Sequence, residues 1–116
     1  MSPGGSVQDG PYYVVQRSAF TARFLIGGEP SETATNADVH VELPDGTVRY
    51  VTFFTLPAIE RVLRRHWDTG ETGGGAYFWS KDLVIVPEAG VPAMVRAVEE
   101  LVRSGDIEAA CQALPR

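Results

Sequence analysis

Hydrophobic and polar residues alternate along much of the first half of the chain, a spacing that is typical of half-buried β-strands. The alternation is cleanest over residues 38–43, and residues 47–55 read as the strand that returns beside it. Aromatic and β-branched residues predict two earlier strands, over residues 13–16 and 20–26. We therefore expect an N-terminal half made of strands joined by short links.

A proline–aspartate–glycine turn at residues 44–46 should join the two middle strands into a hairpin. A type I turn, with glycine in the left-handed bulge position, would place His40 opposite Tyr50. A tighter two-residue turn would instead place Glu42 opposite Arg49. Because a slip of one residue exchanges the two faces of a strand, the two turns predict different cores. We favour the bulged turn, since its proline is accommodated without strain.

Two later segments show the hydrophobic period of an α-helix. The first begins after Thr55, whose hydroxyl suits an N-cap, and ends at Gly70. The second begins at Pro92 and ends at Gly105, and Asp106 is expected to cap a short final helix. The apolar stripe of the second helix is large enough that this helix must dock on the rest of the domain.

The composition and residue pattern of the remaining segments predict a tail and a second hairpin. Residues 1–10 are mainly glycine, serine and proline, so we expect a flexible tail. Residues 76–79 and 83–86 read as a second short hairpin. For residues 11–116 we predict a single α+β domain with an antiparallel sheet of about four to six strands. Two main helices and a short C-terminal helix are expected to pack mainly on one face of this sheet.

Charge and composition narrow the functional classes. The net charge of the 116 residues is −5, which disfavours nucleic-acid binding because phosphate contact needs a concentrated basic surface. No apolar run approaches the ~18 residues of a membrane span, and the N-terminus lacks a signal-peptide pattern, so no membrane partner is expected. The lone Cys111 excludes an internal disulfide and suits a reducing compartment, which predicts a cytoplasmic protein.

The residues that could carry catalysis or bind a metal form no recognisable motif. The glycines at 73–75 follow a helix and precede a strand, the reverse of a phosphate-binding loop, so we read them as a flexible connector. His40 and Glu42 share a strand face, but a zinc site needs at least three protein ligands. Cys111 lies among apolar residues, as a buried thiol usually does. We therefore predict no catalytic residue, no metal and no cofactor.

Aromatic residues gather on the sheet face that is expected to lie opposite the helices. The candidates for a protein interface on this face are Tyr50, Phe54, His40, Tyr77 and Trp79. Tryptophan and tyrosine are enriched at binding hot spots, and so aromatic a face suggests an interaction surface. The leading hypothesis is a non-catalytic module, regulatory or immunity-like, that binds a protein partner or forms a homodimer.

The alternative hypothesis is a small-molecule or anion-binding protein, with a pocket between the sheet and the first helix. The candidates for this site are Arg61, Arg65, His66 and Trp67. An enzyme is the third hypothesis. Its chemistry would have to come from His40, His66, Glu42 or Asp82, which match no known catalytic motif.

The middle of the chain also resembles known sequences. The stretches VELPDGTVRYVTFFTL and GAYFWSKDLVIV resemble those of small bacterial hypothetical proteins with an α+β fold and no assigned activity. The resemblance covers residues 38–86. It implies the fold class, but it implies no catalytic residues.

Overall fold

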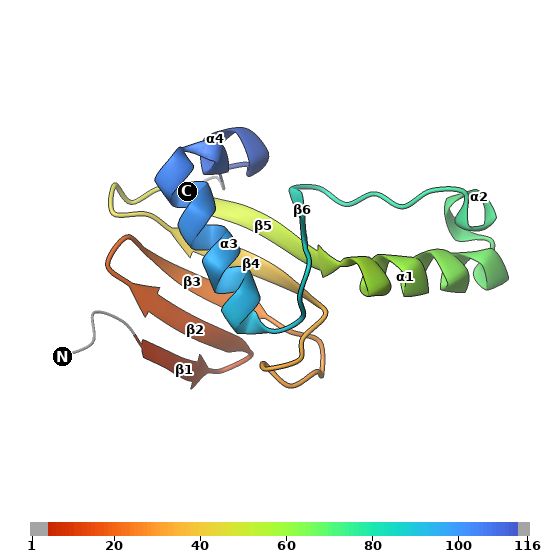
Figure 1. The fold of residues 1–116 in the computed structure, drawn as a ribbon, viewed down its shortest axis with the longest axis horizontal. Helices are drawn as coiled ribbons and strands as arrows, with labels where there is room; N and C mark the ends of the chain where they lie inside the picture. Colours follow the sequence, from red (N-terminus) through yellow and green to blue (C-terminus); the bar gives the residue numbers. More distant parts are fainter. Residues whose placement is uncertain (1–4, 114–116) are drawn as a thin grey trace.

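The structure, a computed structural model, describes residues 5–113 as a six-stranded sheet with two long and two short helices. The strands are β1 (Gly5–Asp9), β2 (Tyr12–Arg17), β3 (Phe20–Leu25), β4 (Asn36–Glu42), β5 (Val48–Thr55) and β6 (Leu83–Val86). The helices are α1 (Leu56–Thr69), α2 (Glu71–Gly75), α3 (Val91–Ser104) and α4 (Asp106–Ala110). The strands lie across the sheet in sequence order, and all neighbours are antiparallel except β5 and β6 (Figure 1). The fold class is α+β, as predicted.

The prediction of a flexible tail over residues 1–10 is wrong for Gly5–Asp9. These residues form β1, which pairs antiparallel with β2 at the edge of the sheet. Every side chain of β1 is exposed, so the strand is held chiefly by its backbone pairing. Without buried side chains, β1 has no hydrophobic alternation by which its sequence could be recognised. Residues 1–4 of the predicted tail, and residues 114–116 of the predicted domain, lie outside the described residues.

The central hairpin has the predicted register. His40 pairs with Tyr50. The Gly46 amide donates to the Leu43 carbonyl at 2.9 Å, and the Leu43 amide donates to the Thr47 carbonyl at 2.8 Å. Gly46 has a φ of 86°, the left-handed conformation that the bulge requires. The bulged turn is therefore confirmed, and the tighter turn is not formed.

The second predicted hairpin is wrong. Residues 76–79 form no strand, and β6 pairs with β5 in the parallel direction, from Thr52↔Leu83 to Thr55↔Val86. The cause is the helix between the two strands. The chain runs outward from the end of β5 through α1 and α2, and it must travel back before it can re-enter the sheet in the same direction (Figure 1).

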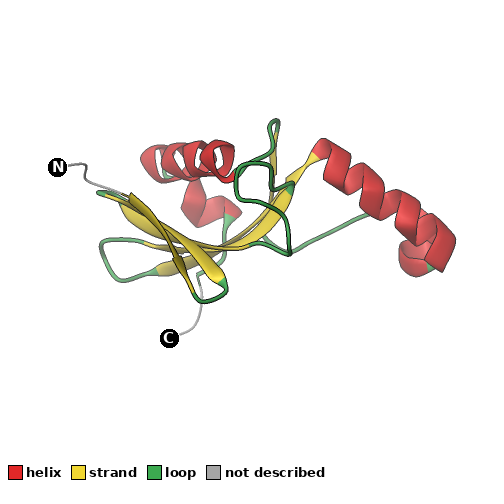
Figure 2. Ribbon diagram, turned by 90° about the horizontal axis from the view of Figure 1, so that it is seen from below, coloured by secondary structure: helices red, strands yellow, loops and turns green. Residues whose placement is uncertain are grey.

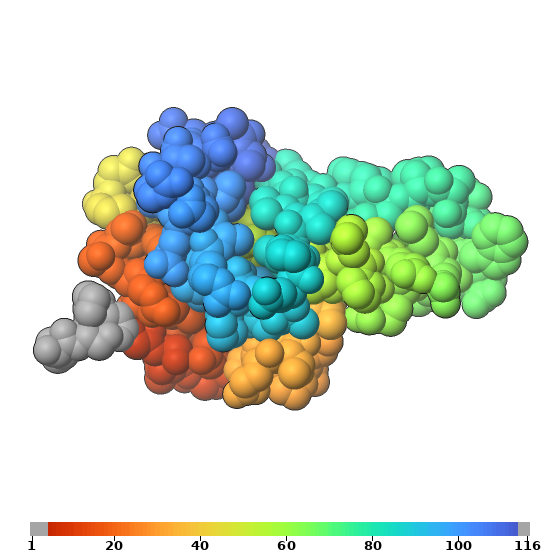
Figure 3. All heavy atoms as spheres, in the orientation of Figure 1, coloured from red at the N-terminus to blue at the C-terminus, as the bar shows by residue number. Residues whose placement is uncertain are grey.

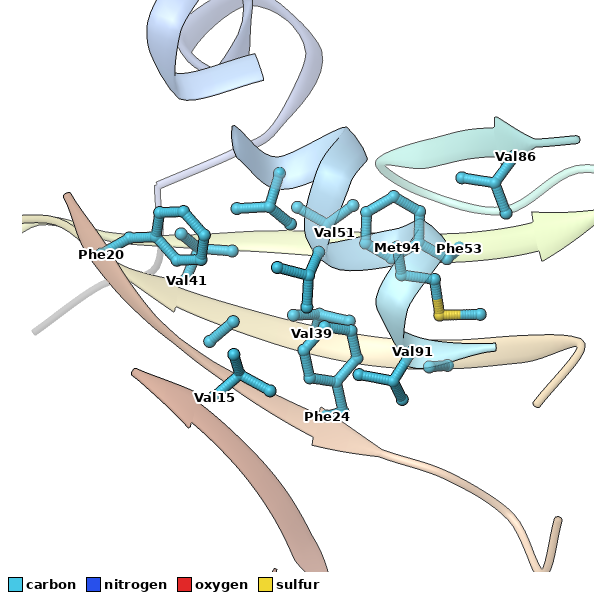
Figure 4. Packing of buried hydrophobic residues seen from close by; sticks show 14 of the residues in the cluster. Val15, Phe20, Phe24, Val39, Val41, Val51, Phe53, Val86, Val91 and Met94 are labelled. Atoms are coloured by element: carbon cyan, nitrogen blue, oxygen red, sulfur yellow. The ribbon is translucent and has the colours of Figure 1, made fainter. Parts of the chain in front are cut away.

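The core lies between the sheet and α3 (Figure 4). Met94 and Val98 of α3 are fully buried, and they belong to one cluster with Phe24 and Phe53 of the sheet. Ile107 of α4 extends this cluster. The prediction that helices cover one face is thus confirmed for α3 and α4, which lie on the same side of the sheet (Figure 2).

For α1, the prediction that it packs on the sheet is wrong. This helix begins where β5 ends and runs outward beyond the end of the sheet, and α2 and the segment after it run back beside it (Figures 1 and 3). The molecule is therefore elongated, and it measures 49 × 29 × 25 Å along its principal axes. We call residues 56–81 the arm. The sheet face that no described helix covers is called the open face (Figure 2).

Candidate functional site

The direction of the arm is determined at Thr55, the last residue of β5. Its backbone is extended, with φ −85° and ψ 160°, and its hydroxyl accepts a hydrogen bond from the Ala58 amide at 3.3 Å. Thr55 is therefore the N-cap of α1, as predicted, and Pro57 lies in the first turn, where an amide hydrogen is not needed. Because no loop separates strand from helix, α1 continues away from the sheet.

The apolar stripe of α1 remains partly open to solvent. Ala58 is buried, but Ile59, Val62 and Leu63 are only half-buried, and Leu56 is 63% exposed. The periodicity correctly predicted a helix here, but it carries no information on what covers the stripe. Among the described residues, α1 makes its most extensive contacts with α2, at the tip of the arm.

The glycine run at the tip of the arm forms a left-handed turn. Thr72, Gly73 and Gly74 have φ between 47° and 74°, and Gly75 has a φ of 82°. Glycine adopts such angles without steric cost. At Gly75 the requirement is also one of space, because an added Cβ would lie 2.5 Å from the Leu63 carbonyl oxygen. Within this turn, Gly75 therefore lies directly against α1, whereas an added Cβ at Gly74 would meet open space. The flexibility expected of this connector stays a prediction.

His66, one of the predicted ligand-binding residues, is buried within the arm. Its Nδ1 lies 2.8 Å from Thr72 Oγ1. That hydroxyl donates to the Glu71 carbonyl, so Nδ1–H is the donor in the contact with His66. Nε2 of His66 faces the Glu71 carboxylate at 3.3 Å. The hydrogen bond at Nδ1 thus ties α1 to α2, and the contact at Nε2 becomes an ion pair when the ring is protonated.

The other predicted ligand residues of α1 do not share a pocket. The Arg61 guanidinium donates to Thr35 Oγ1 at 3.0 Å, near the root of the arm. Arg65 is exposed and makes no hydrogen bond or ion pair among the described residues. Trp67 is 77% exposed. The hollow beside α1 lies between this helix and Gly75 of α2, and not between helix and sheet as predicted.

This hollow is a shallow groove of about 390 Å³ along one side of the arm. Its lining residues are Glu60, Leu63, Arg64, Trp67, Asp68 and Gly75. The absence of a side chain at Gly75 lets α2 lie directly against α1 beside the groove, and Trp67 is one of the groove's lining residues. Arg64 pairs with Glu60 one turn away. The groove thus combines an exposed indole ring with charged residues, the composition found where proteins bind each other.

Aromatic residues of the return segment enlarge the exposed apolar surface of the arm. The Phe78 ring packs edge-on against Phe54 at the end of β5, with ring centroids 5.0 Å apart. Tyr77 and Trp79, on either side of Phe78, are 54% and 70% exposed. The prediction that Tyr77 or Trp79 belongs to a strand on the sheet face is therefore wrong, because they lie on the arm.

The open face carries a row of three rings. His40 lies between Tyr12 and Tyr50, with centroid distances of 6.1 Å and 5.6 Å. All three side chains are half-buried, and no described helix covers them. Partial burial and the neighbouring Asp38 carboxylate raise the pKa of the Tyr50 hydroxyl. His40 and Tyr50 were predicted from the sequence, but Tyr12 was not, because its place in the row depends on the pairing of β2 with β3 and of β3 with β4.

The open face is also acidic. Asp9, Asp38 and Glu42 share it with Arg23, whose guanidinium lies 3.6 Å from Glu42. Asp38 accepts a hydrogen bond from the Thr52 hydroxyl at 3.5 Å. Two carboxylates therefore have no basic partner on this face among the described residues. A positively charged partner surface would be attracted to them.

Another hollow lies on the helix-bearing side, where α3 leaves β1 and β2 uncovered. It has a volume of about 620 Å³. Tyr13, Val15 and Val95 form its apolar lining, and Arg17 and Arg96 lie at its margin. This hollow could not be predicted from the sequence, because it depends on how far α3 extends over the sheet.

The residues of the enzyme hypothesis lie in three different surroundings, and only His40 and Glu42 share one, the open face. Glu42 pairs with Arg23 on the open face. The Asp82 carboxylate accepts a hydrogen bond from the Gln112 amide, whereas both nitrogens of His66 are occupied in the arm. Within residues 5–113, no group of three or more histidine, cysteine or acidic side chains could hold a metal ion. In the same residues, no helix is both long and apolar enough to cross a bilayer.

Comparison with known proteins adds no further assignment. No protein family, curated protein or solved structure matches the chain. The resemblance of residues 38–86 to small bacterial proteins therefore stays a prediction.

Proposed function

We propose that this chain is a protein-interaction module whose main contact surface is the arm. The observation that carries this proposal is the distribution of exposed apolar side chains. Seven large hydrophobic residues are exposed among the described residues, and four of them lie on the arm: Leu56, Trp67, Tyr77 and Trp79. Their concentration on a projecting element, away from the core, marks an interaction site.

The chemistry of these residues supports the same function. Tryptophan and tyrosine are the residues that most often dominate binding energy at interfaces. A fully buried aromatic side chain removes about 150–250 Å² from water. At the exposures of Trp67, Tyr77 and Trp79, covering these three rings would bury roughly 300–500 Å². That is a large part of the about 800 Å² that each partner contributes to a stable interface.

The experiment is affinity capture followed by quantitative binding. Partners that the wild-type protein retains would be identified, purified and titrated against wild type, Trp67→Ala and Trp79→Ala by calorimetry. Arg103→Ala serves as the matched control, because Arg103 is an equally exposed side chain on α3. We expect each tryptophan variant to weaken binding at least tenfold and the control to bind normally. A partner that binds all four proteins equally would reject the arm as the contact surface.

A small-molecule role is the second candidate, and the 620 Å³ hollow beside α3 is the observation that favours it. Its volume is in the range of ligand pockets, about 300–1,000 Å³. Arg17 and Arg96, which share the lining with Glu32 and Glu99, are the candidates to receive an anionic group. Thermal shift measurements with a panel of anionic metabolites would test this role. A ligand that stabilises the wild type but not Arg96→Ala supports it, and the absence of any shift counts against it.

We place the protein in the cytoplasm. The support for this is the lone Cys111, which is buried and unpaired, as is usual in a reducing compartment. Fractionation of cells that produce the protein would test the placement, and recovery from any other fraction would contradict it.

A further inference from the structure

We infer that the partner of the arm is a second copy of this chain, with the arm of each copy lying across the open face of the other. This inference rests on the proposed function, since it names the partner of the same surface. It starts from two unmet packing requirements in one molecule. α1 is an amphipathic helix without a sheet beneath it, and the sheet has one face without a helix above it (Figure 2). Each element supplies what the other lacks.

The two elements cannot meet within one chain. Thr55 is both the last residue of β5 and the N-cap of α1, so no loop allows the helix to fold back over the open face. The Phe54–Phe78 contact holds the root of the arm to the end of β5. A second molecule related by a two-fold axis can satisfy both requirements at once, because the same pair of surfaces is then used twice.

Charge favours this pairing. The arm carries three acidic and four basic residues, a net charge of +1, which leaves −6 for the rest of the chain. On the open face, Asp9, Asp38 and Glu42 outnumber Arg23. Arg65 of α1 has no partner of its own among the described residues. An arm laid on the open face of another copy therefore brings the unpaired Arg65 to acidic residues, whereas two open faces would place acidic residues together and two arms, with a net charge of +1 each, would gain no such attraction.

The available area is adequate for a dimer. Each copy contributes an arm and a face, so both surfaces count toward the about 800 Å² that a partner buries in a stable interface. The exposed rings of Trp67, Tyr77 and Trp79 supply roughly half of it. The half-buried row of Tyr12, His40 and Tyr50 supplies a complementary aromatic surface.

The test is sedimentation equilibrium on two classes of variant, alone and mixed. Trp67→Ala and Arg65→Glu alter the arm, and Asp38→Lys alters the open face. Arg65 and Asp38 are exposed, so these two variants should fold even if another does not, and thermal unfolding would confirm it. Arg103→Glu, a charge reversal on α3, is the control. We expect a wild-type dimer whose dissociation constant rises at least about 30-fold in each arm or face variant and is unchanged in the control.

Mixing makes the test specific for contact between arm and face. An equimolar mixture of Arg65→Glu and Asp38→Lys can form a heterodimer in which one contact pairs a native arm with a native face and the other has the two charges exchanged, so that opposite charges meet in both contacts. Each variant alone places like charges together in both contacts, so we expect the mixture to associate at least fivefold more tightly than either variant alone. A mixture that associates no better than its components would overturn the inference, because arms would then pair with arms or faces with faces. A wild type that is monomeric at 100 µM (~100-fold above a micromolar constant) would also overturn it, yet arm-dependent binding of another protein would still uphold the proposed function.

Discussion

Phe54, at the end of β5, packs edge-on against Phe78 of the return segment, with ring centroids 5.0 Å apart and planes inclined at 66°. The two residues belong to different parts of the chain, the sheet and the arm. Their contact is the point where the returning segment rejoins the body of the molecule. The orientation of the arm therefore depends on a pair of half-buried rings as well as on the direct passage from β5 into α1.

The Phe54–Phe78 pair should stabilise the root of the arm. A double-mutant cycle with Phe54→Leu and Phe78→Leu should give a coupling free energy of about 0.5–1.5 kcal/mol, the value typical of aromatic pairs. Denaturant unfolding measures the coupling. Amide hydrogen exchange in residues 76–82 should also become faster in Phe78→Leu, while exchange in α3 stays unchanged. Strictly additive effects of the two substitutions would show that the contact contributes nothing.

Gly75 and Gly74 form a matched pair of substitutions at the tip of the arm. Both have positive φ, but an added Cβ at Gly74 meets open space, whereas at Gly75 it would lie 2.5 Å from the Leu63 carbonyl oxygen. Gly74→Ala should therefore cost about 1–2 kcal/mol of unfolding free energy. Gly75→Ala should cost more, about 2–4 kcal/mol, or displace α2 from α1. If urea unfolding showed equal losses of unfolding free energy for Gly74→Ala and Gly75→Ala, Gly75 would not lie so close to α1.

The N-cap at Thr55 offers a test of the passage from strand to helix. Thr55→Val keeps the shape of the buried side chain but removes the oxygen that accepts from the Ala58 amide. We expect a loss of about 1–2 kcal/mol. Thr55→Ser keeps the oxygen and should lose less, although it gives up a buried methyl group. If the valine variant were the more stable of the two, the hydroxyl would not be acting as a cap.

The raised pKa of the Cys111 thiol predicts that the protein becomes less stable at alkaline pH. Burial raises the pKa of its thiol to about 11, with a smaller rise from Asp82 and an opposing effect of Arg49. In the unfolded chain the thiol ionises near its ordinary pKa of 9.0, so the unfolded state loses the proton first. The contribution of this thiol to the free energy of unfolding is thus fully present below pH 9. It falls by about 2 kcal/mol between pH 9 and 11. Chemical denaturation at pH 8, 9 and 10 should show a steeper decline in the wild type than in Cys111→Ala, and parallel curves would contradict the assignment.

The parts of the fold that depend on neighbouring residues were predictable from the sequence. The turn at residues 44–46 determines its own geometry, and the alternation beside it places the valines on one face, so the register of β4 and β5 could be derived. The caps of α1 at Thr55 and Gly70 are equally local. In these segments local conformation and side-chain pattern agree, which is the condition under which sequence specifies structure directly.

The parts that were missed depend on distant contacts. The period of α1 predicts a helix but not whether a sheet lies beneath it, so the arm could not be anticipated. The parallel pairing of β6 requires knowledge of where the arm returns. β1 buries no side chain and has no pattern to detect. The prediction of the candidate site was affected most. Tyr77 and Trp79 were expected on the sheet but lie on the arm, and the contact of Tyr12 with His40 requires three strands to be paired.

The fluorescence of Trp67 tests the central claim, that the arm is a contact surface, most directly. Trp79→Phe leaves Trp67 as the only tryptophan, and its indole is 77% exposed in the single chain. As protein concentration rises, or on addition of a captured partner, we expect its emission to shift to shorter wavelength and its quenching by acrylamide to fall at least twofold, because the ring leaves water. Sedimentation in the same samples reports complex formation. A complex in which Trp67 remains as readily quenched as in the free chain would contradict the claim.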